Sequence, residues 1–270
     1  MQSLVINLAR APGRWASMSA LGTARGLAFE RLEAVDGRDP DLLAKSACGG
    51  GGLRPGEVAC FESHRAAWRR IAAGTGSHGL VMEDDVFPAG DLAPWLAAAA
   101  EALPALDIIK LNAHPRGALM RRMPLAVVAG RAVVQPTHAT DDSSAYLITR
   151  GFAERALALH AGYSRPLDVA LFDPATGVRL GQADPALTIQ QKDASFRFLD
   201  TEAEATSIQV TLEERRLERP RKGPVEAAAA ELRRFGRRKV WPAVQPALNL
   251  LRPAAERLEF RRIAFEDRAP

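Results

Sequence analysis

Short apolar runs alternate with longer helix-like stretches along the first 160 residues, and this alternation limits the folds open to the chain. The run at 4–8 is followed by a helix candidate at about 12–26, which opens with proline and closes on glycine. A strand candidate at 29–35, a helix at 55–73 and a strand at 80–86 continue the pattern. Strands that alternate with helices predict a mixed α/β sheet with helices on both faces.

The segments that follow extend this sheet. Asp91 is placed to cap a helix through about Leu103, and a further strand candidate lies at 107–111. Later elements are a hairpin with arms at 126–128 and 132–134, and a strand at 144–149 that leads into a helix ending near 162. In such sheets ligands bind at the carboxyl ends of the strands, so we expect the functional site at one of these ends.

Three acids stand at one of these strand ends. Glu83, Asp84 and Asp85 directly follow the apolar pair Val81-Met82. Adjacent carboxylates repel one another and raise each other's pKa unless a cation neutralises them, so the triplet suggests a divalent-metal site. Hard oxygen ligands point to Mn²⁺ or Mg²⁺, which typically hold the phosphates of a nucleotide. The alternative is that the acids cap the following segment or lie solvated in a loop.

Composition places the chain among ordinary globular proteins. It has 270 residues, of which 47% are apolar and 25% charged, and no apolar run approaches the roughly 20 residues that span a bilayer. The first residues lack the basic flank and cleavage site of a signal peptide, so we expect a cytoplasmic protein. Cys48 and Cys60 have no metal-binding spacing, and we assign them no chemical role.

The positive charge is concentrated in the C-terminal part. Residues 1–211 carry 21 Lys/Arg against 23 Asp/Glu, whereas 212–270 carry 15 against 9. We therefore divide the chain into a catalytic domain at 1–211 and a basic helical tail at 212–270. Basic residues beside Trp241 and several leucines suit a segment lying on an anionic membrane surface, which would make the protein peripheral on the inner face. The alternative is a solvated helix packed on the body. No nucleic-acid-binding motif accompanies the basic residues, so we do not expect nucleic acid as a partner.

Several separated segments together resemble glycosyltransferase family 25, which contains bacterial lipooligosaccharide and lipopolysaccharide galactosyltransferases. The resemblance spans about residues 4–210 and leaves out the tail. The strongest matching segments, in order along the chain, are Ile6-Asn7-Leu8 with Arg14, Ala34-Val35-Asp36-Gly37, Gly56-Glu57-Val58-Ala59-Cys60 through Ser63-His64, and Leu80 to Val86. Weaker similarities follow at Ser144 to Ile148, Pro166-Leu167-Asp168, Ile189-Gln190 and Ser207-Ile208.

The resemblance implies a GT-A-like fold and a sugar-transfer reaction. The expected donor is a UDP-sugar, with galactose as the first candidate, and the expected acceptor is a cell-surface glycan or glycolipid. A divalent ion, Mn²⁺ or Mg²⁺, would neutralise the departing diphosphate. We expect Asp85 to be the most direct ligand, paired with Glu83, and Glu83 and Asp84 to share metal and ribose contacts. Asn7, Arg14 and Asp36 complete the residues expected near the nucleotide, Arg14 through its fork of donors.

An inverting transfer also needs a base that takes the proton of the acceptor hydroxyl. Asp168 is the first candidate, from the resemblance of residues 166–168, with Asp142 and Asp141 as reserves. Each of these acids, and equally Arg14, fits a local structural role as well. His64 either orients substrate or is a structural histidine, and we favour the structural role because one histidine defines no site.

Two function classes remain open from the sequence. The first is an active, metal-dependent glycosyltransferase, and the second is an inactive relative that binds a nucleotide sugar or scaffolds polysaccharide assembly. All three acids are present, which favours the enzyme. A phosphatase or nucleotidyltransferase is disfavoured because no nucleophile motif and no glycine-lysine phosphate loop accompany the acids.

Overall fold

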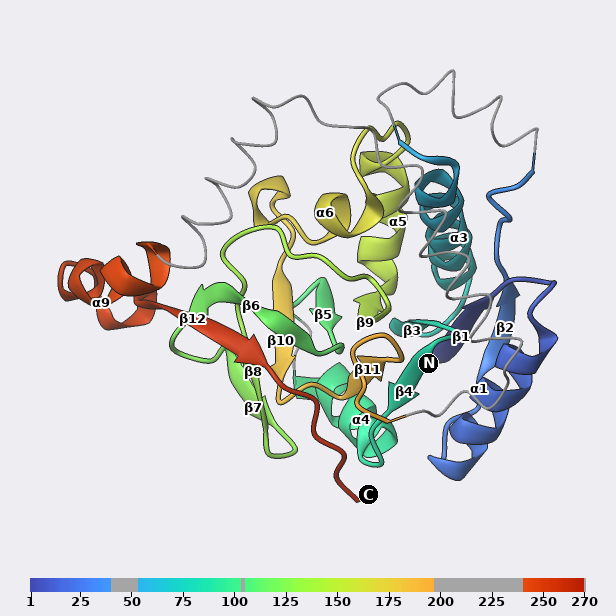
Figure 1. The fold of residues 1–270 in the computed structure, drawn as a ribbon, viewed down its shortest axis with the longest axis horizontal. Coiled ribbons are helices and arrows are strands. Elements are labelled where there is room, and N and C mark those ends of the chain that lie inside the picture. Colours follow the sequence, from blue (N-terminus) through green and yellow to red (C-terminus); the bar gives the residue numbers. More distant parts are fainter. Residues whose placement is uncertain (40–52, 103–104, 197–239, 270) are drawn as a thin grey trace.

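A computed structural model of the protein describes residues 1–39, 53–102, 105–196 and 240–269 (Figure 1). Its centre is an eight-stranded sheet with the strand order β2-β1-β3-β9-β5-β10-β8-β7. β9 runs antiparallel to both of its neighbours, whereas the pairs β1–β2, β1–β3 and β5–β10 are parallel. The strands are β1 (Gln2–Asn7), β2 (Glu30–Glu33), β3 (His78–Glu83), β5 (Ile108–Lys110), β7 (Ala126–Val128), β8 (Arg131–Val134), β9 (Ala145–Thr149) and β10 (Leu180–Asp184).

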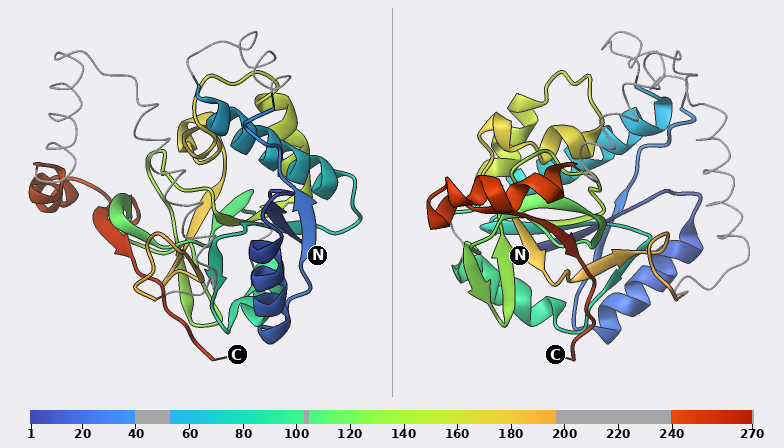
Figure 2. Two further views of the ribbon diagram at one scale, coloured as in Figure 1. Left: turned by 45° about the vertical axis from the view of Figure 1, so that its right-hand side comes forward. Right: turned by 60° about the vertical axis from the view of Figure 1, so that its left-hand side comes forward.

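Helices cover both faces of this sheet (Figures 1 and 2). On one face lie α3 (Pro55–Ala72), α5 (Arg150–Leu159) and the short α6 (Leu167–Leu171), and on the other lie α1 (Pro12–Ala24) and α4 (Leu92–Ala102). Alternate residues of β1 enter the two cores: Leu4 packs with the α3 side and Val5 with the α1 side. This two-sided burial explains the continuous apolar runs of the central strands. The mixed α/β fold with helices on both faces is confirmed.

The predicted strand at 80–86 is interrupted at the acids. β3 ends at Glu83, a turn follows, and the chain resumes as β4 (Val86–Pro88). β4 leaves the main sheet and pairs antiparallel with β11 (Thr188–Gln190), which places Gln190 opposite Val86. The turn between β3 and β4 therefore lies beside a segment more than a hundred residues further along the chain.

A second ribbon carries the end of the chain. β6 (His114–Arg121) pairs antiparallel with β12 (Leu258–Ile263), and α9 (Trp241–Leu250) lies against β12 at the edge of the molecule (Figure 1). Two short 3-10 helices are η1 (Pro174–Thr176) and η3 (Ala254–Glu256). Beyond β12, Asp267 accepts hydrogen bonds from Arg25 and from the backbone of Gly90, so the chain terminus is attached to the body.

These contacts correct the expectation of a helical tail at 212–270. Its last part is the strand β12, whose Ile263 is buried in a core with Met120 and Val134. β12 pairs with β6 and thereby covers the edge of β6 that would otherwise be exposed. The boundary at 211/212 and most of the basic stretch lie outside the described residues, so the domain division stays a prediction. Within the described ranges, no helix has both the length and the apolar character needed to cross a bilayer.

Candidate active site

The middle acid of the triplet is turned into the protein. Asp84 accepts a hydrogen bond of 2.6 Å from the Asn7 side chain and forms an ion pair of 2.9 Å with Arg14, and only 9% of its side chain is exposed. Asn7 is itself fully engaged, since its amide also donates to the Ala11 carbonyl and its oxygen accepts from Arg31. Asp84 and Asn7 thus fix the turn after β3.

The flanking acids face one another across a glutamine. The Gln190 amide nitrogen lies 3.2 Å from a Glu83 oxygen and 3.0 Å from an Asp85 oxygen. The side chains of Glu83 and Asp85 are 27% and 19% exposed, so a small ion can reach both. Two carboxylates and an amide are the hard oxygen donors that Mn²⁺ and Mg²⁺ prefer, provided that the amide turns its oxygen inward. The residues therefore fit a divalent cation.

The electrostatics of Asp85 agree with this fit. Burial, and then the negative charge of Glu83, raise the pKa of Asp85 to about 7, although Arg14 acts in the opposite direction. The Arg14 guanidinium lies 3.8 Å from the Asp85 carboxylate, farther than it lies from Asp84. The local positive charge is consequently too small to keep Asp85 fully ionised at neutral pH, and a bound cation would supply additional positive charge.

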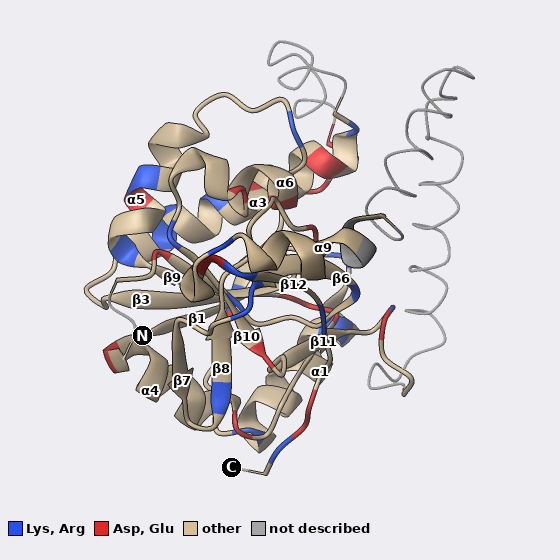
Figure 3. Cartoon of the chain, turned by 90° about the vertical axis from the view of Figure 1, so that its left-hand side faces the viewer, with Lys and Arg blue, Asp and Glu red and all other residues tan. Residues whose placement is uncertain are grey.

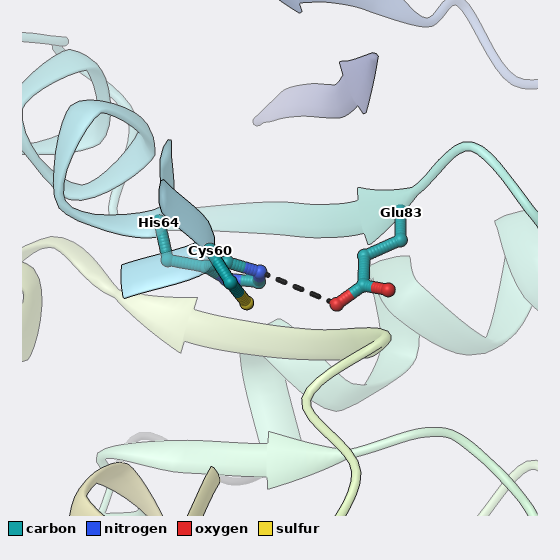
Figure 4. A group of neighbouring side chains, drawn as sticks. All are labelled: Cys60, His64 and Glu83. Atoms are coloured by element: carbon teal, nitrogen blue, oxygen red, sulfur yellow. Dashed lines mark ion pairs between the residues drawn. The ribbon is translucent and has the colours of Figure 1, made fainter. Parts of the chain in front are cut away.

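A chain of buried polar groups approaches Glu83 from the α3 side. Trp68 donates to the Tyr146 hydroxyl over 2.9 Å, and the same hydroxyl lies 2.9 Å from Nδ1 of His64. The other ring nitrogen, Nε2, lies 3.5 Å from the Glu83 carboxylate (Figure 4). His64 is thus held by structural contacts, as expected, but it is also directed at a site acid. The thiol of Cys60, to which we assigned no chemical role from its spacing, lies in the same group.

Two of the three candidate bases, Asp141 and Asp142, lie in the loop that precedes β9. Asp142 has a left-handed backbone with φ 71°, and one of its oxygens accepts from the backbone of Ser144, whose carbonyl in turn bonds to the backbone of Glu83. Burial opposes ionisation of Asp142, but Lys192 and the Ser144 hydrogen bond outweigh it and lower its pKa. A strained non-glycine residue beside a site acid is typical of a functional position.

Asp168, the first candidate base, lies in the first turn of α6 and contacts this loop. Its two carboxylate oxygens accept from the backbone nitrogens of Asp142 and of Val169, so it connects the loop to the first turn of α6. Lys110 supports the same loop from β5: its ammonium donates to Thr140 and to the Asp141 carbonyl, and burial lowers its pKa to about 8. The sequence signal for this role is a lysine inside an otherwise apolar strand, since lysine is rarely buried without a partner.

Asp36 is not joined to the acidic group by any contact among the described residues. Asp36 lies in the loop that follows β2. Its carboxylate accepts from the side chain of Arg10, which follows β1, and from the backbone of Arg38 in its own loop. The interactions with Arg10 and Arg38 outweigh burial and lower its pKa. The structure thus brings together Asn7, Arg14 and the three acids at one sheet edge and leaves Asp36 at a neighbouring loop.

Sequence and structure comparisons place the chain among known proteins. Residues 1–169 match the sequence model of glycosyltransferase family 25, described as LPS biosynthesis protein. No protein of curated function matches the sequence. Among solved structures, the inositol-1-phosphate CTP transferase from T. maritima aligns with a TM-score of 0.37 and 11% identity, over 79% of this chain and 96% of that one. HddC from Yersinia pseudotuberculosis, complexed with GMP-PN, aligns with a TM-score of 0.37 and 13% identity, over 70% and 93%.

Proposed function

The chain belongs to glycosyltransferase family 25, and we propose that this glycosyltransferase moves a sugar, galactose foremost, from a UDP-sugar to a cell-surface glycan or a lipid-linked acceptor, with inversion at the anomeric carbon. The observation that carries the proposal is the pair of partly exposed carboxylates, Glu83 and Asp85, linked through Gln190 at the end of a central strand. Asp84, which is committed to Asn7 and Arg14, has a positioning role in this proposal.

Glu83 and Asp85 would hold Mn²⁺ or Mg²⁺. When bound, the cation supplies positive charge to the diphosphate leaving group. Arg14 has the right character to contact the same diphosphate, since its guanidinium sits between Asp84 and Asp85 and 14% of the side chain is exposed. Because Asp84 orients Arg14 through their ion pair, loss of either residue is expected to weaken donor binding.

Asp142 is the proposed base, in place of Asp168. In the transfer, an acceptor hydroxyl oxygen bonds to the anomeric carbon while the bond from that carbon to the diphosphate oxygen breaks, and the hydroxyl proton passes to the carboxylate of Asp142. The lowered pKa keeps Asp142 ionised at neutral pH, and its contact with Asp168 fixes the loop. Asp168 acts as a positioning residue because both of its oxygens already accept backbone hydrogen bonds.

We further propose that the C-terminal part contacts an anionic membrane surface. Leu250 and Leu251 are 82% and 85% exposed at the end of α9, and Arg252 follows them directly. Figure 3 shows that α9 itself carries no charged residue, whereas basic residues lie on the neighbouring β12 and β6. Apolar side chains beside cations favour insertion at the headgroup boundary.

Donor binding with and without metal tests the catalytic proposal. We expect UDP-galactose to raise the melting temperature of the protein in the presence of Mn²⁺ and not in the presence of a chelator, because a ligand of the native state stabilises it by mass action. Asp85→Asn should lose the Mn²⁺-dependent part, while Glu154→Gln, which changes an exposed acid on α5, should retain it. A Mn²⁺-dependent shift that survives in Asp85→Asn would refute the site.

Sedimentation with liposomes tests the membrane proposal. The wild-type protein should bind vesicles that contain phosphatidylglycerol and should be released by salt. Replacing Leu250 and Leu251 by serine should abolish binding, whereas Val127→Ser, which changes a 65% exposed apolar residue on β7, should not. Salt-insensitive binding, or none, would remove this proposal and leave the catalytic one intact.

A further inference from the structure

A thiol, an imidazole and a carboxylate converge next to the acidic turn. Cys60 and His64 lie one helical turn apart on the same side of α3, and Glu83 reaches them from the end of β3 (Figure 4). One potential ligand atom of each residue lies within 4.8 Å of the other two. Residues four apart on a helix project from the same face, so the spacing of Cys60 and His64 is suited to binding one ion.

His64 is oriented as a metal ligand would be. Its ring is buried, and within the described part of the chain Nε2 has no hydrogen-bond partner. Nδ1 is held at 2.9 Å by the Tyr146 hydroxyl, which Trp68 holds in turn. Metal-binding histidines usually use their second nitrogen in this way, because the hydrogen bond fixes both the tautomer and the plane of the ring. With its proton on Nδ1, His64 would direct a free lone pair from Nε2 toward Glu83.

The separations between the ligand atoms of Cys60, His64 and Glu83 are close to those around a bound zinc ion. Bond lengths of about 2.0–2.3 Å place the ligand atoms of a tetrahedral zinc ion roughly 3.3–3.6 Å apart. The His64–Glu83 separation of 3.5 Å already meets this condition. The remaining separations, at most 4.8 Å, need a shift of about 1 Å, which rotation of the Cys60 side chain can provide.

We propose that Cys60, His64 and Glu83 form a second cation site, for a soft divalent ion of the zinc type, with an open fourth position. A thiolate and an imidazole favour zinc over Mn²⁺ or Mg²⁺, which take oxygen ligands. Binding would release the thiol proton of Cys60 to solvent, while His64 binds as the neutral ring. This site is distinct from the pair Glu83 and Asp85 but shares Glu83, whose two oxygens face the two sites. The proposal does not depend on the sugar-transfer assignment.

Cobalt is the probe, because Co²⁺ replaces zinc in such sites and a bound thiolate gives it a charge-transfer absorption in the near ultraviolet. The metal-free, reduced, full-length protein is titrated with Co²⁺ and then with zinc against a chromophoric chelator. We expect one equivalent of Co²⁺ to give the thiolate band and zinc to displace it. Cys60→Ser should abolish the band, and His64→Gln should weaken zinc binding at least about tenfold.

The controls separate this site from its neighbours. Cys48→Ser removes the other cysteine of the chain and should leave the band unchanged, and Asp85→Asn should also retain it while losing the Mn²⁺ response. Circular dichroism checks that each variant is folded, and Cys60→Ser decides the test if His64→Gln is unfolded. The inference is overturned if Co²⁺ gives no thiolate band, if the band survives in Cys60→Ser, or if it disappears in Cys48→Ser.

Discussion

Replacing Asp85 by asparagine should stabilise the protein when no divalent cation is present. Burial and the charge of Glu83 raise the pKa of Asp85 to about 7 from 3.8, so the folded state holds its proton more tightly than the unfolded state does. Keeping this carboxylate ionised therefore destabilises the fold. The penalty is absent below about pH 4, grows as the pH rises from 4 to 7 and is complete above 7.

The size of the effect follows from the difference between the two pKa values. Each tenfold change in proton affinity corresponds to about 1.4 kcal/mol, which sets an upper limit of about 4 kcal/mol. Since the side chain is 19% exposed, and asparagine weakens the contact with Arg14, we expect a gain on the order of 2–4 kcal/mol at pH 8. Asparagine has nearly the same shape and keeps an acceptor for Gln190, so packing should change little.

Urea denaturation in the presence of a chelator measures this difference. Midpoints are recorded at pH 5, 6, 7 and 8 for the wild type, Asp85→Asn and the surface control Glu154→Gln. The advantage of Asp85→Asn should shrink as the pH falls, and Mn²⁺ should reduce it at pH 8 by stabilising only the wild type. Equal stability of wild type and Asp85→Asn at pH 8, or a difference that does not vary with pH, would refute the electrostatic argument.

Three further predictions concern neighbouring groups. Tyr146→Phe removes the hydroxyl shared by two buried partners and should lower the free energy of unfolding by about 2–5 kcal/mol, whereas Tyr163→Phe, at the only other tyrosine, should cost about 1 kcal/mol or less in the same urea assay. Asp91→Ala leaves the guanidinium of the fully buried Arg131 without its carboxylate and should cost about 3–5 kcal/mol, seen as a fall in the urea midpoint; a loss below 1 kcal/mol would contradict this. Zinc should weaken Mn²⁺-dependent donor binding in a thermal-shift assay because both sites use Glu83, and Cys60→Ser should remove that antagonism.

The central sheet was predictable because its signals are local. The runs that became β1, β3 and β9 are apolar and bounded by turns, and the helices begin and end close to the expected residues. The hairpin of β7 and β8 was equally local, because two short apolar runs flank Ala129 and Gly130, and both of these residues adopt positive φ in its turn. Spacing also grouped Glu83 with Asp85, the two acids that contact Gln190.

The long-range contacts had no such signature. β6 pairs with β12, which lies more than a hundred residues further along the chain; β6 does not alternate, and the alternation in β12 is confined to residues 258–261. The inward turn of Asp84 depends on Asn7 and Arg14, which lie about seventy residues earlier. The anchoring role of Asp168 likewise depends on the backbone of Asp142. Such roles arise from tertiary packing, and the identity of each side chain is compatible with several of them.

Pairing of β6 with β12 has a consequence for biosynthesis. β12, the partner strand of β6, follows every strand of the main sheet in the sequence and therefore leaves the ribosome after them, as do Glu266 and Asp267, which contact Arg131 and Arg25. A nascent chain can therefore assemble its main sheet while the edge of β6 still lies open to other strands. Shortened versions that stop before residue 258 should share this exposed edge and associate through it. A smaller soluble fragment therefore has to retain the residues of β12.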